Sequence, residues 1–221
     1  MMQPVAMRAI CAALGPLLVL SACAAEQEKL YAVPTPMAAS EMPATGRHEQ
    51  AISLYIAPEI GGLQTPFQYS VKGMGSCTVT IAAGPPLESA IENVTRAAFA
   101  RVMRGGGLAQ PLAGVDRHIA VQLDSLTMAP PEMRVRLSGY DTEADADLGL
   151  RVSVYDGQGR LLLRRALPAA GHGEIKAATS WSCAALGGDI ESKAIGDAIR
   201  KLMQAYAQSV LDAPELTTAP D

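Results

Sequence analysis

Apolar and polar residues alternate along several segments of the chain from residue 51 onwards, and this pattern constrains the fold most strongly. Alternation of this kind places one side of an extended segment against a core. The pattern predicts strands over Ala51–Ala57, Cys77–Ala82, His118–Leu126, Met133–Tyr140, Leu148–Asp156 and Arg160–Leu167. Glycines and Pro66 interrupt residues 61–73, where we expect no strand. The turn from Asp156 to Gly159 predicts that the last two strands form a hairpin.

Two segments instead carry apolar residues at steps of three and four, the period of a helix. The first is Leu87–Arg104, with Glu88 and Glu92 toward its start and Arg104 at its end, as the helix dipole favours. The second begins near Asp189, the expected N-cap, and its apolar stripe continues to Val210. The order of elements predicts an α+β domain over residues 51–213, an antiparallel sheet with two helices packed on one face.

The first 22 residues lie outside this domain. Arg8 precedes an apolar run, Ala9–Leu20, that is too short to span a bilayer as a helix. The run ends in Leu20-Ser21-Ala22-Cys23, which resembles the lipobox of bacterial lipoprotein signal peptides. The resemblance implies cleavage before Cys23, diacylglycerol on its thiol and a further acyl chain, such as palmitate, on the new amino group. Several chains anchor a protein stably.

An ordinary secretory signal with a chance cysteine is the alternative, and the mature chain is extracytoplasmic in either case. Ala24 after the lipidated cysteine favours the outer membrane by the sorting rule of enteric bacteria.

Residues 23–50 contain the lipidated Cys23 and a segment with no sustained period but with Pro34, Pro36 and Pro43. Prolines keep such a segment extended. We therefore expect a flexible tether with a reach of about 90 Å at roughly 3.3 Å per residue, enough to hold the domain well clear of a membrane. Residues 214–221 are predicted to form a short tail.

Four cysteines are present, of which Cys11 is removed with the signal peptide and Cys23 is lipidated. This leaves Cys77 and Cys183 in an oxidising compartment, where two remaining thiols suggest one disulfide. Two separate buried thiols are the alternative.

Charge and motif content exclude several functions. With 18 basic and 22 acidic residues, the chain lacks the positive surface that grips nucleic acid. Its three histidines, His48, His118 and His172, are not at metal-ligand spacing, and we expect no metal, cofactor or catalytic residue.

The acidic segment Asp141–Asp147 resembles a calcium loop, but Ala146 stands where that loop needs glycine and Val152 where it needs glutamate. We expect a solvated connection between two strands. The alternative is an envelope enzyme or metal-binding protein that uses residues 141–147.

Taken together, the lipobox, the tether and the order of elements resemble small Gram-negative lipoproteins. These are the YajG-type lipoproteins, the lipopolysaccharide-assembly lipoproteins of the LptE type and the auxiliary lipoproteins of envelope lipid-transport ABC systems. The resemblance spans residues 51–213 and is carried by Leu87–Val94, Arg117–Leu126, the hairpin around Asp156-Gly157, and Ala194–Ile199.

This resemblance implies a non-catalytic, lipid-anchored binding or assembly protein at the periplasmic face of the outer membrane. Its partner would be an envelope protein or a lipid-like ligand. A passive structural lipoprotein remains the other alternative.

Overall fold

The computed structural model describes residues 29–33, 48–71, 75–129, 131–136, 139–178 and 188–217. The strands are β1 Lys29–Ala32, β2 His48–Ile56, β3 Gln64–Val71, β4 Gly75–Ala82, β5 Phe99–Arg104, β6 Arg117–Met128, β7 Glu132–Arg136, β8 Gly139–Asp156 and β9 Leu161–Ala178. The helices are α1 Pro58–Gly61, α2 Gly84–Ala98, α3 Asp189–Tyr206, its π-helical continuation η3 Ala207–Leu211, and α4 Pro214–Thr217. The α+β class predicted from the sequence is confirmed.

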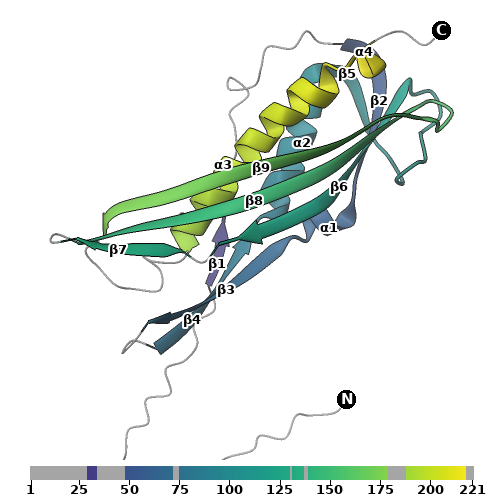
Figure 1. Cartoon of the computed structure of the whole chain (residues 1–221). Coiled ribbons are helices and arrows are strands. Elements are labelled where there is room, and N and C mark those ends of the chain that lie inside the picture. Colours follow the sequence, from purple (N-terminus) through teal and green to yellow (C-terminus); the bar gives the residue numbers. More distant parts are fainter. Residues whose placement is uncertain are drawn as a thin grey trace, which may run out of the picture.

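The main sheet is mixed, so the prediction of a wholly antiparallel sheet is wrong. β2 lies between β5 and β6 and is parallel to both, whereas β8 is antiparallel to β6, β7 and β9 (Figure 1). A parallel pair needs a crossover connection. The chain between β2 and β5 contains α2, and the loop 105–116 returns the chain from the end of β5 to the start of β6.

The predicted helix over Leu87–Arg104 is also too long. α2 ends at Ala98, and the chain reverses into β5, where Phe99 is buried. Residues 99–104 indicate neither a strand nor a helix clearly, because both alternating sets, Phe99-Arg101-Met103 and Ala100-Val102-Arg104, mix apolar residues with arginine. Pairing with β2 decides between the two.

The acidic segment 141–147 lies inside β8 and is not a solvated connection between two strands. Ala144, Ala146 and Leu148 alternate with the acids and are buried in the core. Each acid therefore projects from the opposite side of the strand. The acids at alternate positions, which resembled a calcium loop, are therefore the polar positions of a strand whose other side is apolar.

Helix α3 packs against β8 and β9, whereas α2 packs against β5 and reaches α3. The hydroxyls of Thr95 on α2 and Tyr206 on α3 are 3.0 Å apart in the core. Where β9 crosses α3, Gly171 and Gly173 face the backbone of the helix. None of the helices in the described part of the chain has the length and apolar character needed to cross a membrane.

A second, three-stranded sheet has the order β1-β4-β3. β3 lies within residues 61–73, where no strand was expected. It tolerates Pro66 because it is an edge strand. β1 lies within the segment predicted to be a flexible tether, and it pairs in parallel with β4. β2 begins three residues before the predicted start of the domain, and α4 lies within the predicted tail.

Candidate functional site

A hollow of about 100 Å³ opens at the carboxyl ends of the parallel strands β2 and β5. Ligands of α/β proteins commonly bind at this end of parallel strands. The hollow is lined by Leu54, Tyr55, Ile56, Glu88, Glu92, Arg104 and Gly105.

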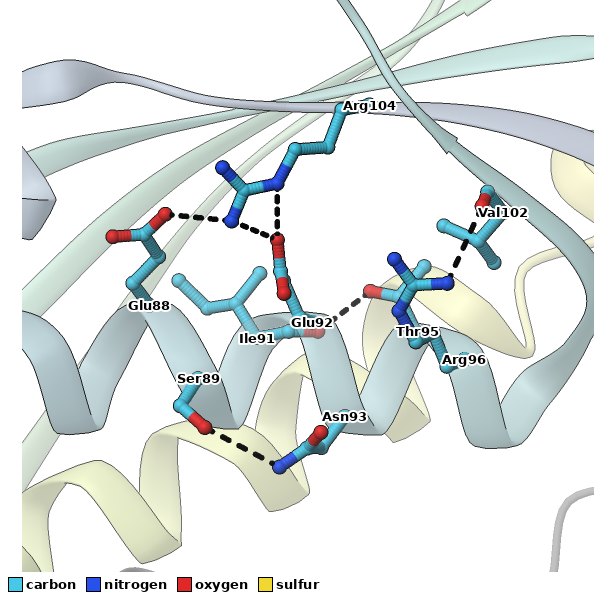
Figure 2. A network of polar contacts seen from close by, with 9 residues as sticks. All are labelled: Glu88, Ser89, Ile91, Glu92, Asn93, Thr95, Arg96, Val102 and Arg104. Carbon is cyan, nitrogen blue, oxygen red and sulfur yellow. Dashed lines mark hydrogen bonds and ion pairs between the residues drawn. The ribbon is translucent and has the colours of Figure 1, made fainter.

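Arg104 reaches from β5 to two carboxylates on α2 (Figure 2). Its Nε donates a hydrogen bond to Glu92 Oε1 at 2.7 Å, and its guanidinium also donates to Glu88 Oε1 at 3.1 Å. The hydrogen bond to Glu92 is the largest cause of the raised pKa of Arg104. Two carboxylates on one helix therefore share the guanidinium of Arg104 at the rim of the hollow.

The sequence pattern missed this cluster because it placed Arg104 at the far end of the same helix as Glu88 and Glu92. The helix ends at Ala98, and β5 runs back alongside it. The expected arrangement of charges along one helix dipole is therefore replaced by direct ion pairs between a helix and a strand.

A larger, open groove of about 520 Å³ lies between β9 and the C-terminal helical segments. Its lining consists of Arg165, Ala166, Leu167, Gln208, Ser209, Asp212, Ala213, Pro214 and Glu215. Small-molecule sites typically measure roughly 300–1,000 Å³, so this groove is large enough for such a ligand, whereas the hollow beside Arg104 is not.

Ser53 and His118 form a hydrogen bond that sequence reasoning missed. They are cross-strand neighbours in β2 and β6, and Ser53 Oγ lies 2.5 Å from His118 Nδ1. His118 Nε2 lies 2.9 Å from the carbonyl oxygen of Gly107. A carbonyl can only accept, so Nε2 carries the proton and Nδ1 accepts from the serine.

This serine–histidine pair has the connectivity of a nucleophile and its base. However, both side chains are 0% exposed. The loop 105–116 bonds to the pair through Gly107 and Leu108. Burial lowers the pKa of His118, which keeps the ring neutral. The arrangement therefore fastens this loop onto the sheet and offers a substrate no access to the hydroxyl.

The acids of β8 do not converge on one point. Asp141 is buried and Asp145 is exposed, where it pairs with His172 Nδ1 at 2.8 Å. Among the residues that the structure describes, no group of three or more His, Cys, Asp or Glu side chains could hold a metal ion.

Side chains from the helices cover parts of two outer strands of the main sheet, β5 and β9. On β5, the carbonyl of Val102 accepts a hydrogen bond from Arg96. On β9, the amide of His172 donates to Asp197 and the carbonyl of Ala170 accepts from Lys201. An added strand would have to displace these contacts, so these stretches are poor templates for strand addition.

The predicted site residues Cys23 and Cys183 lie outside the described residues. Cys77 is in β4, where its backbone is opposite Tyr69 of β3. Lipidation of Cys23 and a Cys77–Cys183 disulfide therefore stay predictions.

Comparison with known proteins assigns this chain to no family. The chain matches no known protein family, and no curated protein matches it. Among solved structures, it is similar to a minor lipoprotein from Acinetobacter baumannii, with 12% identity, 72% of this chain and 92% of the other covered, and a TM-score of 0.36.

Two further structures are similar at the same level. One is a neuraminyllactose-binding hemagglutinin homolog from Helicobacter pylori, with 10% identity, coverage of 76% and 88%, and a TM-score of 0.42. The other is a hypothetical protein from Chlamydia trachomatis, with 10% identity, coverage of 73% and 96%, and a TM-score of 0.35. Scores this low carry no argument about function.

Proposed function

We propose that this chain is a lipid-anchored, non-catalytic binding protein of the bacterial envelope, held at the periplasmic face of the outer membrane. The observation that carries the proposal is the sequence Leu20-Ser21-Ala22-Cys23 directly after a short apolar run. Lipid on Cys23 anchors the domain, and Ala24 directs it to the outer membrane.

Binding, rather than catalysis, is supported by the contacts of the polar residues. The serine–histidine pair is closed to substrate, and the acids of β8 lie along one side of a strand instead of around one centre. No observation favours an enzyme or metal-binding protein that uses residues 141–147. The groove beside β9 is the surface that we assign to the partner, an envelope protein or a lipid-like ligand of a transport or assembly pathway.

Substitution of Cys23 by serine is expected to abolish incorporation of labelled palmitate and to move the protein from the membrane fraction to the soluble fraction. The reason is that serine offers no thiol for diacylglycerol, and without it the acyl chains are lost. Cell fractionation and palmitate labelling measure the two effects. The matched control is Cys77→Ser, which should keep the label and the membrane location. A Cys23→Ser protein that stays labelled would contradict the proposal.

A photoreactive amino acid at Ser209, in the groove, is expected to crosslink one discrete protein or lipid species in living cells. The same group at Thr127, an exposed position on β6, should not give this adduct. Ala166→Trp should remove the adduct by filling the groove, whose lining includes Ala166. Mass spectrometry of the adducts identifies the species. Equal adducts at both positions, or no effect of Ala166→Trp, would count against the groove as the binding surface.

A further inference from the structure

We infer that the end of the molecule built from β1, β3 and β4 faces the membrane surface, because β1 holds the chain close to its lipid anchor. The inference rests on the proposed lipidation of Cys23. The partner that this end meets is the headgroup layer of the bilayer in which the lipid is inserted.

The evidence is the pairing of β1. It runs parallel to β4 over four residue pairs, from Lys29 with Val79 to Ala32 with Ala82. Val33, which follows directly, is 5% exposed and belongs to the hydrophobic core. β1 also contacts α3. The chain is therefore attached to the folded domain at Lys29, well before β2 begins at His48.

This attachment shortens the link between lipid and domain. Only residues 24–28 separate Cys23 from Lys29, and an extended chain spans at most about 3.5 Å per residue, which gives a reach of roughly 20 Å. Without β1, the link would continue to His48 and reach about 85 Å by the same rule. The domain thus stays next to the bilayer instead of standing well clear of it.

The position of the small sheet then sets the orientation. Figure 1 shows β3 and β4 extending from one end of the molecule, whereas α4 and the connection between β8 and β9 lie at the opposite end. Gln64, Pro66 and Gln68 of β3 are exposed and uncharged, which suits a hydrated headgroup surface. The groove beside α4 consequently faces away from the anchoring membrane, where an envelope partner can reach it.

Energy transfer to a labelled membrane tests this orientation. The full-length lipidated protein is reconstituted into phosphatidylcholine vesicles that contain an acceptor-labelled lipid. A donor dye is attached through an unnatural amino acid at Gln68 on β3 or at Gln158 in the turn between β8 and β9, both exposed. We expect strong transfer from position 68 and weak transfer from position 158. Equal transfer from the two positions would overturn the inference.

Two matched insertions test the role of β1. A flexible Gly/Ser linker of about 20 residues is placed either after Glu28, before β1, or after Pro36, between β1 and β2. Insertion after Glu28 should remove most of the transfer from position 68, because it lengthens the link to the lipid. Insertion after Pro36 should leave the transfer unchanged, because β1 still holds the chain upstream of the linker.

Equal loss of transfer from both insertions would show that β1 does not hold the chain, and would overturn the inference while leaving the lipid anchor intact. Failure of the uninserted protein to bind vesicles would instead overturn the proposed lipidation, and the inference with it. Thermal unfolding of each inserted protein, compared with the parent, verifies that the domain keeps its fold.

Discussion

Gly171→Ala is expected to destabilise the domain by about 3 kcal/mol, the upper part of the range for overpacking a core. A Cβ atom at this position would overlap the carbonyl oxygen of Ala194 and the amide nitrogen of Ala198, and would lie 2.8 Å from Ala198 Cβ. These are backbone or Cβ atoms of α3, so no side-chain rotation can relieve the overlap. Either β9 or the whole helix must shift.

Urea unfolding measures this effect. Gly106→Ala is the matched control, because a Cβ there has no atom within 4 Å and Gly106 does not have a positive φ. The control should be neutral or stabilise the protein slightly, since alanine reduces the entropy of the unfolded chain. Equal unfolding midpoints for Gly171→Ala and the parent would show that β9 and α3 are not in this close contact.

Glu191→Gln is expected to stabilise the domain by about 3 kcal/mol near neutral pH, and by much less near the ordinary pKa of glutamate. Glu191 on α3 is 0% exposed, and no other described residue donates a hydrogen bond to its carboxylate. Burial raises its pKa from 4.5 to about 8. At neutral pH the folded protein therefore holds a proton that the unfolded chain releases.

The sign of the pH dependence follows from this difference. Between pH 4.5 and about 8, the folded state binds more protons than the unfolded state at this residue, so its contribution to stability falls as the pH rises. Each pH unit in this window lowers the free energy of unfolding by about 1.4 kcal/mol. Glutamine has nearly the same shape but no charge, and it removes this pH-dependent cost.

Unfolding free energies of the parent and Glu191→Gln, measured from about pH 5 to about pH 8, should diverge steadily as the pH rises. Asp189→Asn is the matched control in the same turn, because Asp189 is exposed. It should run parallel to the parent, with a small loss from the helix dipole. Parallel curves for Glu191→Gln and the parent would mean that Glu191 is ionised in the folded protein as it is in the unfolded chain, and would contradict the prediction.

Several elements could be predicted because their signals are local. The hairpin at Asp156 is confirmed: the Asp156 amide donates to the carbonyl of Arg160, and the Asp156 carboxylate accepts hydrogen bonds from the amides of Gln158 and Arg160. The alternation along β6 and the apolar stripe of α3 are equally local signals. Their apolar positions Ile119, Val121 and Ile195 are buried.

Other elements could not be predicted because their signals were short or ambiguous. β1 has only four residues, and it exists because β4 lies beside it. β5 has no clear period of either kind, and its pairing with β2 makes it a strand. Neither element makes enough local contacts to offset the conformational entropy lost when its chain is ordered. Each therefore forms only beside a tertiary partner.

The contacts of the candidate sites join residues that are far apart in the sequence, so local patterns did not predict them. Sequence separations of 12 and 16 residues divide Arg104 from Glu92 and Glu88, and 65 residues divide Ser53 from His118. No periodicity links such positions, because a period reports only which residues share one face of one element.

The amino-acid sequence by itself determined the α+β class, the hairpin at Asp156 and the apolar faces of the long strands and helices, because each depends on residues two to four positions apart. Only the tertiary structure decided the parallel pairing of β2, the close contact of Gly171 with α3, and the attachment of β1 to β4. These depend on which surfaces meet when the core is buried, and a pattern along one segment does not contain that information.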